Sequence, residues 1–176
     1  MKTNSNSYTI IYSAIIVVVV AFLLAFVYQA LKPMQEANVA LDQKKQVLYS
    51  LNIRGLDNAA AEATYNKVVK EEKTVDGSKM FICNVNGATK YVFTMKGMGL
   101  WGGISGYVSV NADKSTVYGA YFNHEGETAG LGAEIKDNQK WQEKFQGKKL
   151  FKGADRNAIA ISVLKKRDSN DPNSVD

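Results

Sequence analysis

The sequence predicts an α+β fold: one transmembrane helix at the N-terminus, followed by a single domain in which helices flank a mostly antiparallel sheet. Two observations indicate this fold. No charged residue occurs between Lys2 and Lys32, and most residues of that stretch are strongly apolar. Further along the chain, the spacing of apolar residues changes from helical to alternating. We therefore divide the chain into residues 1–31 and a folded domain, residues 32–176.

The stretch from Ile10 to Leu31 is long enough to cross a bilayer, since roughly 20 helical residues span a hydrocarbon core of about 30 Å. A cleaved signal peptide is the alternative, but its apolar part spans only about 7–15 residues and ends in small residues. We therefore expect a retained, single-pass anchor in the lipid bilayer. Lys2 on one side and Lys32, Lys44 and Lys45 on the other leave its orientation open.

Two helices are predicted after this segment. Ala37, Leu41, Leu48 and Leu51 have helical spacing, which predicts a helix over roughly 34–53. Asp57 is a suitable N-cap for a second, alanine-rich helix from Asn58 to about Glu72.

The pattern then becomes that of an antiparallel sheet. Asn86–Gly87 is a strong type I′ turn signal between two alternating segments. A short helix carrying Trp141 and Phe145, whose spacing of four predicts core packing, follows the sheet. The predicted strands are Met80–Val85, Lys90–Met95, Ser105–Val110, Thr116–Asn123 and Ala158–Leu164, with a polar tail, Lys165–Asp176.

Charge and cysteine content exclude several classes of protein. The formal net charge is only +5 and is spread along the chain, so we expect no nucleic-acid partner. Cys83 is the only cysteine, which excludes an internal disulfide and a cysteine-based metal site. Its alternation with Phe81 and Val85 predicts a small buried side chain.

Gly97, Gly99 and Gly102 match the G-x-G-x-x-G fingerprint of dinucleotide sites. That fingerprint requires a following helix, whose N-terminal N–H groups bind the pyrophosphate, whereas a strand is predicted here. Two interpretations remain: a loop with left-handed backbone angles, or a glycine-lined surface that lets a flat ligand approach. In the second case Leu100 and Trp101 supply apolar contacts.

A second glycine-rich segment, His124–Gly132, contains the only histidine. No recognised metal-ligand spacing accompanies it, so we expect no metal site. Acid–base catalysis by His124 with Glu127 remains open, although no nucleophile signature is present. A loop whose hydroxyl, carboxylate and N–H groups bind a ligand fits these residues better.

Taken together, these segments resemble a known family. The apolar N-terminus, Gly97–Tyr107, His124–Glu134 and Trp141 with Lys144–Lys148 are similar, in this order, to the C subunit of the sodium-translocating NADH:quinone reductase. The corresponding flavin protein of the related Rnf complex, its G subunit, is the alternative, but it usually lacks a Gly-Leu-Trp segment such as Gly99–Trp101.

The resemblance implies an FMN-binding domain that relays electrons inside a membrane-bound respiratory complex. It implies a single-pass protein of the cell inner membrane, with the domain in the periplasm and other membrane subunits as partners. By the same resemblance Glu127, Thr128, Gly130, Leu131 and Gly132 line the isoalloxazine ring, with Leu100 and Trp101 nearby. No residue of this chain is expected to be catalytic, because the flavin carries the chemistry.

In the family, the FMN phosphate is joined to a threonine that follows a Val-Asp pair, in a Ser-Gly-Ala-Thr motif. Here the printed sequence ends at Val175–Asp176. We therefore expect the attachment threonine to lie beyond this end, and the 176-residue chain to bind FMN weakly and without a covalent bond. Two other functions remain open: a cofactor-free membrane assembly module, and an anchored hydrolase using His124 and Glu127.

Overall fold

A computed structural model describes residues 5–153, 156–166, 168 and 170–176. Contacts divide the chain into two units, Met1–Leu41 and Asp42–Asp176. Residues 1–4 of the expected N-terminal tail lie outside the described residues.

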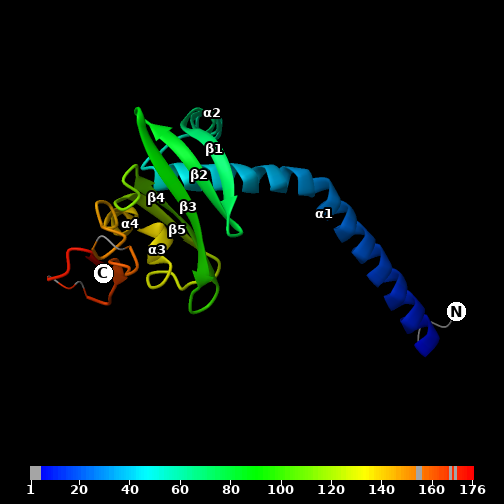
Figure 1. Cartoon of the computed structure of the whole chain (residues 1–176). Coiled ribbons are helices and arrows are strands. Elements are labelled where there is room, and N and C mark those ends of the chain that lie inside the picture. Colours follow the sequence, from blue (N-terminus) through cyan, green and yellow to red (C-terminus); the bar gives the residue numbers. More distant parts are fainter. Residues whose placement is uncertain (1–4, 154–155, 167, 169) are drawn as a thin grey trace. The chain divides into compact units, whose positions relative to one another are not determined.

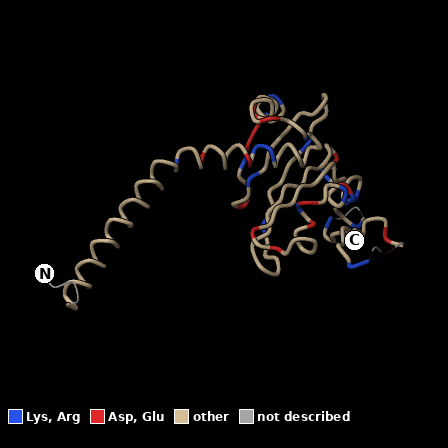
Figure 2. Tube along the Cα trace, turned by 180° about the vertical axis from the view of Figure 1, so that it is seen from behind, with Lys and Arg blue, Asp and Glu red and all other residues tan. Residues whose placement is uncertain are grey.

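The first unit consists of the greater part of helix α1, which runs from Asn6 to Ser50. Its most apolar stretch of 18 residues has a mean hydropathy of 3.1, and none of that stretch is buried by the rest of the protein. Figure 2 shows no Lys, Arg, Asp or Glu along the first part of the described helix. In the sequence the first charged residue of this helix is Lys32. Among the described residues, α1 is the one helix long and apolar enough to cross a membrane.

The sequence predicts separate helices before and after Pro33, but Pro33 lies inside α1. Proline removes one backbone N–H and therefore one helical hydrogen bond. A helix of 45 residues keeps its other hydrogen bonds on both sides of that position. The expected break was wrong, whereas the apolar helix itself is confirmed.

The second unit contains a five-stranded antiparallel sheet whose strands lie side by side in chain order (Figure 1). The sequence predicts four of these strands, β2 to β5, and each predicted bound lies within three residues of the observed one. Asn86 and Gly87 have φ angles of 51° and 83°, as a type I′ turn requires. The strands are β1 (Val69–Val75), β2 (Ser78–Val85), β3 (Ala88–Met98), β4 (Gly103–Asn111) and β5 (Val117–His124).

Strand β1 replaces the predicted end of the second helix. Helix α2 (Asn58–Val68) begins as predicted, with the Asp57 side chain accepting a hydrogen bond from the Ala60 N–H at 2.8 Å. It ends at Val68, however, and not near Glu72. The strand that follows pairs with β2, and six of its seven residues are exposed, so no alternating apolar pattern marks it.

One face of the sheet packs against the last turns of α1. Val47 and Leu51 lie in one core cluster with Phe81, Cys83 and Val92, all of which are buried. Gly119 lies where the helix end approaches the sheet most closely, since a Cβ there would clash with the Ser50 carbonyl oxygen. The Ser109 hydroxyl donates a hydrogen bond to the same oxygen at 2.5 Å. This contact fixes the end of α1 against strands β4 and β5.

The other face packs against the C-terminal third of the chain. Helices α3 (Glu134–Asp137) and α4 (Gln139–Glu143) contact β5. The rings of Trp141 and Phe145 pack against each other and against Phe122, which confirms their predicted core role.

The C-terminal end differs from its prediction in two ways. The last apolar segment forms only a short strand, β6 (Ser162–Val163). The tail expected to be polar contains its parallel partner, β7 (Ser174–Val175), in which Val175 is buried against Val108 and Phe145. A single apolar residue among polar ones gives no periodic signal, so this strand was missed.

Cys83 is 1% exposed, as the sequence predicts. Burial raises the pKa of its thiol to about 12, so little thiolate forms near neutral pH. We expect a thiol reagent at pH 8 to modify the folded chain roughly 100-fold or more slowly than the urea-unfolded chain, because only the thiolate reacts. Labelling at equal rates in the two states would contradict this burial.

Candidate functional site

The candidate site forms where two glycine-rich segments meet at one end of the sheet. The first connects β3 to β4 and closes on itself through a hydrogen bond from the Gly99 N–H to the Gly102 carbonyl at 2.8 Å. Strand β4 begins at Gly103, directly after it. A strand therefore follows the G-x-G-x-x-G pattern, as predicted, and the helix N-terminus that a dinucleotide site requires is absent from this described segment.

The second segment follows β5, and the side chains of two glutamates hydrogen-bond it to the first segment. Glu127 Oε1 accepts a hydrogen bond from the Trp101 N–H at 3.0 Å. Glu125 Oε2 accepts one from the Gly103 N–H at 3.3 Å, and the Glu125 N–H donates to the Gly103 carbonyl at 3.0 Å. These contacts bring together residues that lie more than 20 positions apart in the sequence.

Two glycines make room for the Glu127 side chain. A Cβ at Gly99 would lie well inside contact distance of Glu127 Oε1, and a Cβ at Gly132 would lie 2.6 Å from Oε2. The carboxylate thus lies between the two segments, where larger residues would displace it. Its Oε1 atom links the second segment to the first.

The other residues predicted to contact the flavin lie at the surface of these two segments. Leu100, Trp101 and Leu131 are 82%, 71% and 73% exposed. Thr128 is exposed too, and its carbonyl accepts hydrogen bonds from the N–H groups of Leu131 and Ala133, both at 3.1 Å. Gly130 has a φ of 72°, which a glycine adopts without strain. We call Leu100, Trp101 and Leu131 the apolar rim.

The geometry gives His124 a different role from acid–base catalysis with Glu127. His124 Nδ1 accepts a hydrogen bond from the Glu127 backbone N–H at 3.2 Å, while the Glu127 carboxylate is bonded to Trp101. The imidazole therefore contacts the main chain of Glu127 and orders the turn. In the described part of the chain, no three histidine, cysteine or acidic side chains lie together in a way that could hold a metal ion.

A polar network beside α3 was not predicted from the sequence. Arg54, which follows α1, donates a hydrogen bond to the Gln142 side-chain oxygen at 2.6 Å, and Gln142 donates in turn to the carbonyls of Ile135 and Lys136. The Arg54 guanidinium also lies 5.2 Å from the ring centre of Tyr49, and burial lowers its pKa. The network joins α3, which directly follows the Glu127 segment, to α4 and to Arg54. Arg54 and Gln142 are 88 residues apart, so no local pattern could reveal their contact.

Residues 99–176 match the family model of the FMN-binding domain, and this range contains every predicted site residue. Over 98% of its length the chain is 28% identical to the C subunit of the Na(+)-translocating NADH-quinone reductase from Haemophilus ducreyi, of which it covers 82%. It is 41% identical to the same protein from Neisseria meningitidis serogroup A over 85 residues, which make up 48% of this chain and 32% of that one.

Two solved structures are also similar. The crystal structure of this reductase subunit from Parabacteroides distasonis is 34% identical and covers 83% of both chains, with a TM-score of 0.73. The crystal structure of NqrC from Shewanella oneidensis, at 22% identity and a TM-score of 0.63, has the same fold.

Proposed function

We propose a function from one starting fact: the chain belongs to the NqrC family, the C subunit of the sodium-translocating NADH-quinone reductase. We propose that this protein is a flavin-carrying subunit that relays electrons between neighbouring subunits of such a complex. Residues 1–31 form its membrane anchor and residues 32–176 its FMN-binding domain. The proposed location is the cell inner membrane, with the domain on the periplasmic side.

The observation that supports this proposal is the junction between the two glycine-rich segments. The exposed apolar rim offers flat apolar contacts, and the glycines permit close approach of a planar ring to the backbone. Exposed apolar side chains that form one patch mark ligand or partner sites. These residues therefore fit an isoalloxazine ring.

In this proposal the residues have different roles. Leu100, Trp101 and Leu131 contact the ring, and Thr128, Gly130 and Gly132 shape the turn beside it. Glu127 holds the two segments at a fixed separation through its bond to the Trp101 N–H. When bound, FMN supplies electron-transfer chemistry, and the chain supplies its position and electrostatic surroundings.

The long apolar helix supports the proposed anchor. Its most apolar stretch is uncharged, and none of it is buried by the rest of the protein. A tether of this kind keeps the domain beside the bilayer, within reach of other membrane subunits. We propose on this basis that the partners are the remaining subunits of the respiratory complex.

In-gel fluorescence tests covalent flavin attachment. The complete gene product, expressed together with the flavin-transferring enzyme, should keep a fluorescent band after denaturation and electrophoresis, because a covalent bond survives loss of the fold. The same protein expressed without that enzyme is the control and should give a dark band. A colourless product under both conditions would contradict the flavin-relay proposal and favour a cofactor-free assembly module.

A further inference from the structure

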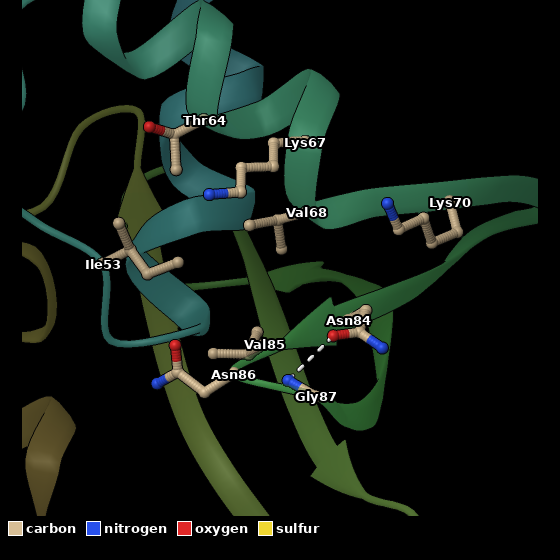
Figure 3. A pocket seen from close by; sticks show the side chains of 9 residues that line it. All are labelled: Ile53, Thr64, Lys67, Val68, Lys70, Asn84, Val85, Asn86 and Gly87. Carbon is tan, nitrogen blue, oxygen red and sulfur yellow. Dashed lines mark hydrogen bonds between the residues drawn. The ribbon is translucent and has the colours of Figure 1, made fainter.

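A hollow lies between α2 and the turn that joins β2 to β3, and neither glycine-rich segment contributes to its lining (Figure 3). Its volume is about 610 Å³, within the usual range for small-molecule sites. Its floor is apolar, formed by Ile53 with the buried side chains of Val68 and Val85. Its rim is polar and contains Thr64, Lys67, Lys70, Asn84, Asn86 and Gly87.

Two lysines from different elements line this hollow, and no carboxylate is among the lining residues. In Figure 3 Lys67 and Lys70 lie on one side of the hollow, and Asn84, Asn86 and Gly87 on the other. Within the described ranges, neither lysine is in an ion pair. Two positive charges therefore line one open hollow, and neither is paired with a carboxylate in the described part of the chain.

The acidic neighbours of Lys70 on β1 are engaged elsewhere. Glu71 pairs with Lys73 at 3.1 Å, and Glu72 pairs with Lys79 at 2.6 Å. Lys67 is in the last turn of α2, where the helix dipole favours a positive charge. Lys70 is an exposed residue of the edge strand β1 and lines the same hollow.

On the opposite side of the rim, the side chains of Asn84 and Asn86 carry amide N–H donors. Asn84 Oδ1 accepts a hydrogen bond from the Gly87 N–H at 3.0 Å. That bond orients the side-chain amide, and its NH₂ group points away from the turn. Ammonium and amide donors together match the oxygens of a phosphate group, which accepts several hydrogen bonds at once.

We propose that this hollow binds a phosphate-bearing ligand, with its phosphate between Lys67 and Lys70 and its less polar part on Ile53, Val68 and Val85. Either a soluble phosphate ester or the headgroup of an anionic phospholipid has this chemistry. The site is separate from the proposed flavin contacts, and the proposal does not depend on them.

Titration of the full ¹⁵N-labelled chain in nanodiscs of neutral phosphatidylcholine tests the site. Inorganic phosphate or glycerol 3-phosphate should shift the Gly87 amide resonance in a saturable way if the ligand is soluble. If the ligand is a lipid, the shift should appear only when part of the nanodisc lipid is phosphatidylglycerol. The absence of a saturable shift with all three probes would overturn the proposal.

Two substitutions that each remove one positive charge distinguish binding at this site from non-specific attraction of phosphate to a basic protein. Lys70→Gln should weaken binding roughly tenfold, because a charge-assisted hydrogen bond contributes about 1.5 kcal/mol. Lys96→Gln is the control: it removes an equal charge on β3, beside a different hollow of about 410 Å³. It should leave the affinity unchanged. Equal weakening by both substitutions would show non-specific attraction and would refute the site.

Discussion

Replacing Gly119 with alanine should lower the free energy of unfolding of the domain by about 3 kcal/mol, the upper end of the usual range for overpacking. The added Cβ would clash with the Ser50 carbonyl oxygen and lie 2.8 Å from Asn52 Oδ1. A backbone carbonyl at a helix end cannot rotate away as a flexible side chain can. The helix end must move, and the hydrogen bond from the Ser109 hydroxyl to Ser50 must lengthen or break.

Thermal unfolding of the full chain in a nonionic detergent, followed by near-ultraviolet circular dichroism, measures this effect. A loss of about 3 kcal/mol corresponds to a fall in Tm of roughly 10 °C for a domain of this size. Gly126→Ala is the matched control, because the nearest atom to its added Cβ is 3.7 Å away, an ordinary contact. If Gly119→Ala melts at the wild-type temperature, the close packing of α1 on β5 is incorrect.

Local signals in the sequence were sufficient for much of the fold. Asn86–Gly87 predicts its hairpin because few other residues adopt positive φ at both turn positions. Asp57 predicts the start of α2 because its carboxylate can accept a free helical N–H. Both features depend only on residues within three or four positions, which a sequence shows directly.

The missed elements depend on partners far away in the chain. Strand β1 is held by its pairing with β2, and its charged, exposed side chains carry no information about that pairing. Val175 is buried because β6 and the second face of the sheet lie beside it. Neither neighbour can be inferred from the residues next to it in sequence.

The candidate site shows the same limit. The sequence indicated two glycine-rich segments with groups suited to a ligand, and the resemblance implied which of their residues line it. It did not indicate that the Glu127 carboxylate bonds the Trp101 N–H, a contact that spans 26 residues. It also gave no sign that Arg54 bonds Gln142 or that Gln142 bonds the backbone of α3.

Breaking the contact between Glu127 and Trp101 should lower the affinity for free FMN roughly tenfold, which corresponds to the loss of one charge-assisted hydrogen bond. The affinity is measured on the complete gene product expressed without the flavin-transferring enzyme, so that FMN binds without a covalent bond. Glu127→Ala removes the acceptor for the Trp101 N–H. Gly99→Ala acts from the opposite side, because its added Cβ occupies the space of Glu127 Oε1. Glu127→Gln keeps a side-chain oxygen of the same reach and should bind flavin within about twofold of wild type.

These substitutions differ from Gly119→Ala in what must move. At Gly99 the obstructing atom is the end of a flexible side chain at an exposed loop, so the domain should lose less than about 1 kcal/mol of stability. Flavin affinity and the Trp101 amide resonance should therefore change while Tm stays near wild type. Wild-type affinity in Glu127→Ala would contradict the proposed role, and equal losses in Glu127→Gln and Glu127→Ala would assign it to the negative charge. If the loss is confined to Glu127→Ala and Gly99→Ala, the spacing of the two segments determines flavin binding.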